Sequence, residues 1–298
     1  MKILITGCKG QLGNELQNII KRGKSEISEI SENIRNSEVI ALDVDVLDIT
    51  KLDQVEQFLN DLKPDVVINC AAATNVDGCE GNEEFAFKVN SIGPRNLAMA
   101  CEKINAKLVQ VSTDYVFSGV GNKTLTEYDL TAPYSSYGKT KLLGEKYVQE
   151  FCSKSFIVRT AWLYGYVGNN FVYTIMKLGK EKDMIKVVND QRGNPTHAND
   201  LAYHILKIIE TEEYGVYHCS GKGECSWYDF AKMIIELSGG KCEVKPCTSE
   251  EYKTPAKRPE YSSLDNIMLR CTVGDEMRNW QDAIKSFVTI SKEELKFT

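Results

Sequence analysis

Apolar runs alternate with segments of helical periodicity along the first half of the chain. Short, continuous apolar runs, typical of strands that are buried on both faces, lie at residues 2–6, 39–42, 65–70 and 107–112. Between them, apolar residues recur at helical spacing over residues 12–20, 52–62 and 83–103. This alternation predicts an α/β fold, a Rossmann-type doubly wound parallel sheet with helices on both faces.

The regular alternation ends after residue 159. Helical patterns at 169–180, 199–210 and 226–238 are then interleaved with short strand-like runs at 185–188 and 216–219. We therefore expect a dinucleotide-binding Rossmann domain over residues 1–160, to which some later segments return. A smaller α/β substrate-binding domain is expected over residues 161–298. The polar residues 22–36 are predicted to form a surface connection.

The first predicted strand runs directly into a glycine-rich turn, Gly7-Cys-Lys-Gly10-Gln-Leu-Gly13, which opens a helical pattern. A turn in this position presents backbone N–H groups and the positive end of the helix dipole to a pyrophosphate, and side chains at the glycine positions would block that approach. The spacing is G-x-x-G-x-x-G rather than the common G-x-G-x-x-G. The turn nevertheless predicts a dinucleotide site.

The second predicted strand ends in Asp43. An acidic residue there can accept hydrogen bonds from the adenosine ribose and would repel a 2′-phosphate, which favours NADH. The alternative is an ordinary acidic loop formed by Asp43, Asp45 and Asp48. Small residues that follow the third strand, Ala71 to Ala73, would let a ligand lie against the backbone.

Tyr137 and Lys141 are four residues apart in a predicted helix, so their side chains share one face. A nearby ammonium favours the phenolate and lowers the pKa of a phenol, which suits proton transfer to or from a substrate oxygen. Any such pair can also be ordinary helix surface. The chain holds four of these pairs: Tyr137/Lys141, Tyr173/Lys177, Tyr203/Lys207 and Tyr228/Lys232.

Position in the predicted sheet separates the first pair from the others. Thr113 and Asp114 end the fourth strand, and the Tyr137 helix comes next. Ligands bind at the carboxyl ends of the strands in such sheets. A hydroxyl, a phenol and an ammonium would thus lie on the side of the sheet that holds the coenzyme.

Composition excludes several classes of partner. The formal net charge of −6 argues against a nucleic-acid or membrane-surface partner, which would need a basic face. No signal-like start or long apolar segment is present, ten cysteines form no C-x-x-C pair, and three histidines form no zinc motif. We expect a cytoplasmic protein with reduced thiols, most of them packed as small apolar groups.

Pro255-Ala-Lys-Arg258-Pro259 is a rigid loop with two cations. In an acidic protein, a fixed guanidinium suits the pyrophosphate of a sugar nucleotide. A solvated basic turn is the alternative.

Seven stretches carry a resemblance to the extended short-chain dehydrogenase/reductase superfamily, and within it to the dTDP-4-dehydrorhamnose reductase family. They run almost from end to end of the chain: TGCKGQLG (6–13), NCAAATNVDGCE (69–80), STDYVFSG (112–119), YGKTKLLGE (137–145), RTAWLYG (159–165), NDQRGNPT (189–196) and AKRPEYSSLDN (256–266). Single motifs are weak, but seven in order are specific.

The resemblance implies residue roles. Thr113 would tune the phenol and hydrogen-bond the substrate oxygen, Tyr137 would donate the proton, and Lys141 would hold the phenol and the ribose. Asp114 and Trp162 would contact the sugar, and Arg258 is our choice for its pyrophosphate, although a tryptophan read without the resemblance is more often a core residue. The residues expected to line the coenzyme are Gly7, Gly10, Gln11, Leu12, Gly13, Asp43, Asp48, Ile49, Ala72, Ala73 and Thr74, with Tyr137 and Lys141.

The resemblance also implies the reaction: reduction by NADPH or NADH of the C4 ketone of dTDP-4-dehydro-6-deoxy-L-mannose, giving dTDP-L-rhamnose for polysaccharide biosynthesis. We expect a monomer or homodimer. Magnesium at a dimer contact is sometimes associated with the family, but Glu15 alone is no metal site, so we predict none. Residues 22–36 are longer than the family pattern, and His197-Ala-Asn-Asp200 replaces a more variable stretch.

Two other functions stay open. The regulatory subunit of methionine adenosyltransferase resembles the same family, but a binding module needs none of Thr113, Tyr137 and Lys141. Another sugar-nucleotide epimerase, reductase or dehydratase is the second alternative. Dehydratases usually carry an acidic pair after the catalytic threonine, whereas Tyr115 follows Asp114 here.

Overall fold

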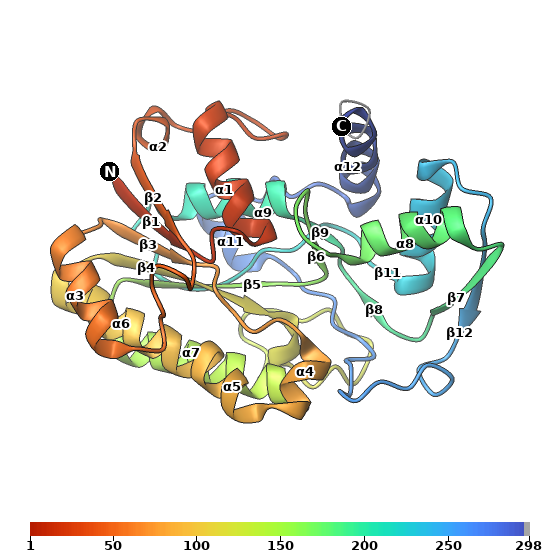
Figure 1. Cartoon of the computed structure of the whole chain (residues 1–298), viewed down its shortest axis with the longest axis horizontal. Helices are drawn as coiled ribbons and strands as arrows, with labels where there is room; N and C mark the ends of the chain where they lie inside the picture. The colour runs from red at the N-terminus through yellow and green to blue at the C-terminus, as the bar shows by residue number, and fades with distance from the viewer. Residues whose placement is uncertain (295–298) are drawn as a thin grey trace.

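A six-stranded, all-parallel sheet forms the centre of the molecule in the computed structural model, which describes residues 1–294 (Figure 1). The strand order is β10-β5-β4-β3-β1-β2. The strands span Lys2–Thr6 (β1), Glu38–Leu42 (β2), Val66–Asn69 (β3), Lys107–Thr113 (β4), Ser155–Thr160 (β5) and Gly215–His218 (β10). The sheet order reverses next to β1, as in doubly wound folds, so the predicted fold class is confirmed.

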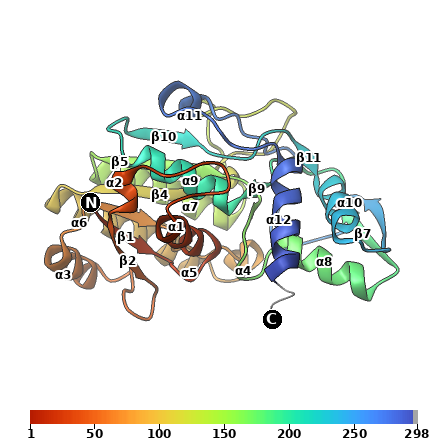
Figure 2. The same cartoon turned by 90° about the horizontal axis from the view of Figure 1, so that it is seen from above.

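Helices cover both faces of the sheet (Figures 1 and 2). One face packs on α3 (Leu52–Leu62), α6 (Gly93–Ile104) and α7 (Ser136–Phe151). The other face packs on α1 (Gln11–Arg22), α2 (Glu32–Arg35), α9 (Ala198–Ile208) and α11 (Ile267–Thr272). Successive side chains of β1 point to opposite faces of the sheet. Leu4 packs against the layer of α3, α6 and α7, whereas Ile3 and Ile5 pack against the layer of α1, α2, α9 and α11.

The helix predicted over residues 83–103 is divided. It consists of α5 (Glu83–Phe87), a π-helical turn at Lys88–Ile92, and α6, with α4 (Val76–Gly81) before it. Such π turns often occur at functional sites. Here the turn places the Asn90 side chain against the chain after β3, where its amide bonds both the N–H and the carbonyl of Ala73 at 2.8 and 3.1 Å.

Residues 22–36 are more than a surface connection, and that prediction was wrong in part. Ile30 and Ile34 are buried in the core. The Glu26 carboxylate accepts hydrogen bonds from Tyr166 and Ser286, each at 2.6 Å, and pairs with Arg278 at 3.0 Å. The polar composition hid these contacts because their partners lie more than a hundred residues away in the sequence.

A smaller layer of helices and short strands lies beyond β5 and includes α8 (Phe171–Glu181), α10 (Trp227–Ser238) and α12 (Trp280–Glu294) (Figure 1). Its core is a separate apolar cluster. Three two-stranded ladders complete it: β6 (Leu163–Tyr164) with β9 (Thr196–His197), β7 (Met184–Val188) with β12 (Glu243–Cys247), and β8 (Arg192–Gly193) with β11 (Cys225–Ser226). The division of the chain at residue 160 stays a prediction.

All ten cysteines are free thiols, and most are buried, as expected from their positions in apolar runs. Within residues 1–294, no helix is both long and apolar enough to cross a lipid bilayer.

Candidate functional site

A cavity of about 1000 Å³ lies at the carboxyl ends of the central strands and extends to the smaller layer. All the predicted site residues line it except Ile49 and Arg258. From the glycine turn around to the smaller layer, the lining ones are Gly7, Gly10, Gln11, Leu12, Gly13, Asp43, Asp48, Ala72, Ala73, Thr74, Thr113, Asp114, Tyr137, Lys141 and Trp162. The structure thus brings the coenzyme-type and catalytic-type residues to one cavity.

The glycine turn leaves room only for backbone. Gly7 has a φ of +64°, and a Cβ there would lie 2.7 Å from the Ala71 nitrogen. A Cβ at Gly13 would lie 2.4 Å from the Gly7 oxygen. Because Gly10 is the N-cap of α1, no side chain covers the first N–H groups of this helix. The turn fits the pyrophosphate of a dinucleotide.

Asp43 lies at the end of β2 and accepts hydrogen bonds from the backbone nitrogens of Lys9 (3.1 Å) and Val44 (2.8 Å). These bonds hold its carboxylate at the cavity. The Lys9 ammonium lies on Asp45 at 2.9 Å, where both side chains are exposed. Asp43 therefore lines the cavity, whereas the Lys9–Asp45 ion pair lies outside the lining.

Ile49 does not line the cavity. Its side chain is buried in the core and contacts the position where a Cβ of Gly93 would stand, while its carbonyl accepts a bond from Asn96 at 3.0 Å. Its neighbours Asp48 and Thr50 do line the cavity. The sequence could not tell which of three successive residues faces inward.

Tyr137 and Lys141 lie one turn apart near the start of α7, which the Ser135 side chain caps by accepting from the Gly138 nitrogen. Both are buried, and Thr113 at the end of β4 lies beside them. The Lys141 ammonium donates to the Val111 carbonyl at 2.6 Å.

Burial sets the protonation of the phenol. It raises the pKa of Tyr137 well above its usual value, and the hydrogen bond with the Thr113 hydroxyl opposes this only in part. This differs from the expected lowering by Lys141. Burial lowers the pKa of Lys141 to about 8, although the negative charge of Glu145 opposes this change. The site therefore holds a protonated phenol near neutral pH.

Asp114 is a further buried titratable group at the cavity. Burial raises its pKa to about 6, and hydrogen bonds from Ser262 and Thr113 oppose the rise. The Thr113 hydroxyl donates to its carboxylate at 2.9 Å. Thr113 therefore links the carboxyl of Asp114 to the phenol of Tyr137.

A buried ion pair holds α7, the helix that carries Tyr137 and Lys141, against the central sheet. Glu145, one turn after Lys141, binds Arg159 of β5 through two nitrogens, and Ser112 of β4 donates to the same carboxylate. The pair joins α7 to two central strands. Sequence reasoning missed it, although Glu145 lies inside the stretch YGKTKLLGE.

Four aromatic side chains line the end of the cavity next to the smaller layer, and we call them the aromatic wall: Trp162, Phe171, Trp227 and Phe230. Sequence reasoning named only Trp162 and missed the other three. Trp162 and Trp227 stack with ring centroids 3.6 Å apart. Phe171 packs on Trp227 at 4.5 Å. Nothing in the local sequence pattern shows that these residues meet.

Arg258 is held next to the cavity rather than in its lining. Its guanidinium binds both oxygens of Asp77 in α4, at 3.0 and 2.9 Å, and also donates to the Thr254 hydroxyl. The Ala256 nitrogen donates to Asp77 as well. The loop therefore joins α4 as an anchored segment, and the hydrogen bonds with Asp77 raise the pKa of Arg258 although burial opposes the rise.

The other three Tyr/Lys pairs lie outside the cavity lining. Tyr173 donates to the carbonyl of Tyr166, and the Lys207 ammonium lies over the ring of Tyr203 at 5.5 Å. Tyr173 and the Tyr203/Lys207 pair thus make structural contacts of their own.

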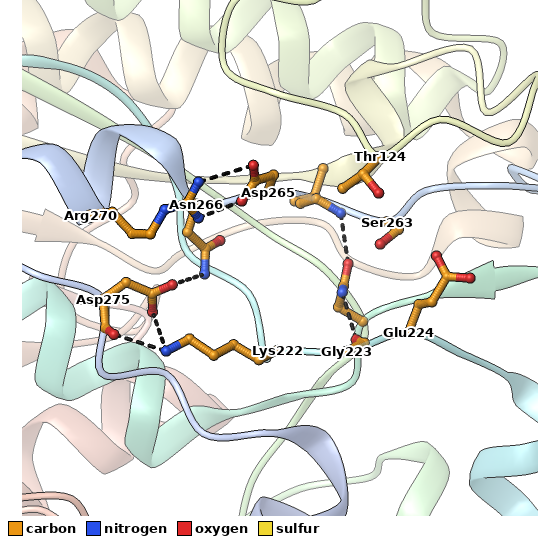
Figure 3. A pocket seen from close by; sticks show the side chains of 12 residues that line it. Thr124, Lys222, Gly223, Glu224, Ser263, Asp265, Asn266, Arg270 and Asp275 are labelled. Atoms are coloured by element: carbon orange, nitrogen blue, oxygen red, sulfur yellow. Dashed lines mark hydrogen bonds and ion pairs between the residues drawn. The ribbon is translucent and has the colours of Figure 1, made fainter.

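A smaller cavity of about 470 Å³ lies near α11, and its lining includes Lys222, Asp265, Arg270 and Asp275 (Figure 3). Arg270 binds both carboxylate oxygens of Asp265, and Lys222 pairs with Asp275 at 3.6 Å. Because these charges neutralise one another and none of the predicted site residues lies here, the chemistry belongs to the larger cavity.

Among residues 1–294, the His, Cys, Asp and Glu side chains form no group of three or more that could hold a metal ion. Glu15 is buried and accepts a hydrogen bond from Asn199 at 2.7 Å.

Three known proteins that resemble this chain over almost its whole length are all dTDP-4-dehydrorhamnose reductases. A crystal structure of a dTDP-4-dehydrorhamnose reductase from Clostridium acetobutylicum is 51% identical, with a TM-score of 0.93 over 98% of this chain and 100% of that one. The same kind of enzyme from Bacillus anthracis, solved in complex with NADP, is 41% identical, with a TM-score of 0.90 over 97% and 99%. The curated dTDP-4-dehydrorhamnose reductase of Aggregatibacter actinomycetemcomitans is 38% identical over 96% of this chain and 97% of its own.

The family model described as RmlD substrate binding domain matches residues 1–293, and so covers both the central sheet and the aromatic wall. The chain belongs to this family.

Proposed function

We propose that the protein reduces the C4 ketone of dTDP-4-dehydro-6-deoxy-L-mannose to dTDP-L-rhamnose with NADPH or NADH, a step of nucleotide-sugar and polysaccharide biosynthesis. One observation carries the proposal. Thr113, Tyr137 and Lys141 open on the same cavity as the glycine turn, and that cavity continues to the aromatic wall. The names and the NADP complex of the relatives support the same reaction.

The nicotinamide coenzyme supplies the hydride when it is bound. The turn from Gly7 to Gly13 would hold its pyrophosphate through backbone N–H groups. Asp43 would accept hydrogen bonds from the adenosine ribose, and Ala72 and Ala73 would let the coenzyme lie against the chain after β3.

The protein supplies the proton. Tyr137 keeps its phenolic hydrogen near neutral pH, so it can donate to the O4 atom of the sugar as that oxygen gains negative charge. The Thr113 hydroxyl, which donates to Asp114 in the structure, would turn from that carboxylate to donate to the same oxygen. The Lys141 ammonium would stabilise the phenolate that remains, which requires a pH below its pKa of about 8.

The substrate would occupy the part of the cavity that lies between the aromatic wall and the three residues Thr113, Tyr137 and Lys141. Asp114 and Trp162 would contact the sugar, and Arg258 beside them would bind the pyrophosphate once it is released from Asp77. A purely regulatory or binding role gives no reason to bury a phenol, a hydroxyl and an ammonium together at one cavity, because their desolvation costs stability.

A coenzyme-oxidation assay with dTDP-4-dehydro-6-deoxy-L-mannose tests the proposal. Tyr137→Phe is expected to lower kcat by about 10²- to 10⁴-fold, the usual range for the loss of a general acid, with coenzyme binding retained. Tyr173→Phe is the matched control, because its hydroxyl lies outside the cavity lining, and it should keep the wild-type kcat. A wild-type protein that oxidises neither coenzyme with any 4-keto sugar nucleotide would refute the function.

A further inference from the structure

Trp162 has an unusual backbone for a bulky residue. Its φ is +47°, in the left-handed region that large side chains rarely adopt. Among the described residues, the other non-glycine cases are Lys63 and Asn105, which are C-caps of helices, where this conformation is common. Trp162 instead lies between β5 and β6, at the wall of the cavity. Strain of this kind persists only where surrounding contacts hold it, and it clusters at functional sites.

Trp227 makes one of the contacts that hold Trp162. The two indole rings are nearly parallel, at 7°, with their centroids 3.6 Å apart. One face of Trp162 is therefore covered by protein, and only the rest of the indole is left to meet a ligand. Phe171 in turn packs on Trp227 at 4.5 Å.

Local structure fixes Trp227 itself. It is the first residue of α10 and lies within a capping box, in which the side chains of Ser226 and Asp229 each accept a hydrogen bond from the other's backbone nitrogen. Ser226 and Cys225 form β11, which pairs with β8. The start of α10 is thus anchored to a ladder, which holds the backbone of Trp227 beside Trp162.

Gly193 of β8 leaves the space that the Trp162 indole needs. A Cβ at this position would lie 2.7 Å from both Cε2 and Nε1 of Trp162. β8 contains Gly193 and pairs with β11, which ends directly before Trp227. The same short ladder therefore leaves space for the Trp162 indole and positions the residue that stacks on it.

We infer that Trp227 is a positioning residue for sugar recognition: by stacking on Trp162, it fixes the surface that Trp162 presents to the substrate. This rests on the proposed function, in which Trp162 meets the sugar. Trp227 acts through Trp162 and not through the coenzyme, which the glycine turn holds at the other end of the cavity.

Three variants test the inference. Trp227→Leu keeps an apolar side chain but removes the ring, and it is expected to raise KM for the sugar nucleotide about 3- to 10-fold, the range for the loss of one aromatic pair. The coenzyme KM should stay at the wild-type value. Trp227→Phe retains a ring that can stack and should restore most of the affinity. Trp280→Phe, in a buried tryptophan outside the cavity lining, controls for the loss of an indole and should change neither KM.

Gly193→Ala provides a second perturbation that leaves Trp227 intact. Its methyl group would displace the Trp162 indole and should raise the same KM. The combination of Trp162→Leu with Trp227→Leu should bind the sugar nucleotide no more weakly than Trp162→Leu alone, because both remove one interaction.

Full additivity in the double variant would overturn the inference, and so would an unchanged sugar KM in Trp227→Leu. A parallel rise of both KM values would also overturn it, because the role would then be structural. Titration calorimetry with dTDP-L-rhamnose gives the same comparison without turnover. An inactive wild-type protein would therefore refute the proposed function alone, whereas an active enzyme that ignores Trp227→Leu would refute the inference alone.

Discussion

Glu145→Gln is expected to destabilise the protein by about 3 kcal/mol, because it leaves a buried guanidinium without its counter-charge. The side chains of Arg159 and Glu145 are only 6% and 2% exposed, and their closest nitrogen and oxygen are 2.7 Å apart. Removal of one partner from a buried pair costs about 3–5 kcal/mol. The glutamine retains one acceptor oxygen and nearly the same volume, which favours the lower end of that range.

Urea unfolding followed by circular dichroism measures this loss. With an m value of about 3 kcal/mol/M, the unfolding midpoint should fall by about 1 M. Glu84→Gln is the matched control, since the Lys88–Glu84 pair is as close, at 2.5 Å, but its side chains are 57% and 77% exposed. Its midpoint should stay near that of the wild type. Equal midpoints for both variants would refute the idea that burial decides the contribution of the pair.

The same substitution should change the pH dependence of activity. Glu145 raises the pKa of Lys141, which burial has lowered to about 8. Loss of this negative charge makes the ammonium less favourable, so Lys141 should lose its proton at a lower pH in Glu145→Gln. The alkaline fall of kcat/KM, expected near pH 8 in the wild type, should therefore move to lower pH. A fall that stays in place or moves to higher pH would contradict this electrostatic assignment.

Three further substitutions test the coenzyme and substrate ends of the cavity. Asp43→Ala should shift the ratio of kcat/KM values from NADH towards NADPH, because the carboxylate at the end of β2 repels a 2′-phosphate; a wild type that strongly prefers NADPH would show that Asp43 serves another purpose. Arg258→Ala should raise KM for the sugar nucleotide about 10-fold or more, as expected for the loss of a charge-assisted bond to phosphate, whereas Asp77→Asn should lower it by freeing the guanidinium. If Arg258→Ala lowers the melting temperature but leaves this KM unchanged, the ion pair only anchors the loop.

The local sequence determined the order of elements, because hydrophobic periodicity and turn residues act over a few residues. The strand over residues 2–6 and the helix over 52–62 were predicted with the bounds that the structure shows. The glycine turn was equally legible, since its function depends on adjacent backbone groups and on the absence of side chains. The pairing of Tyr137 with Lys141 on one face follows from helix geometry alone.

Only the tertiary structure decided contacts between residues far apart in the sequence. Trp227 meets Trp162 from 65 positions further along the chain, and Arg258 meets Asp77 across 181 positions. Glu26 lies in a polar segment whose composition indicates exposure, yet Arg278 draws its carboxylate inward.

Burial likewise reversed the electrostatic expectation for the phenol. The sequence shows that a lysine is near Tyr137, but not that both groups are removed from water, which raises the pKa of the phenol. Desolvation is a property of the assembled fold, because it depends on every layer packed around a group and not on its neighbours in the chain.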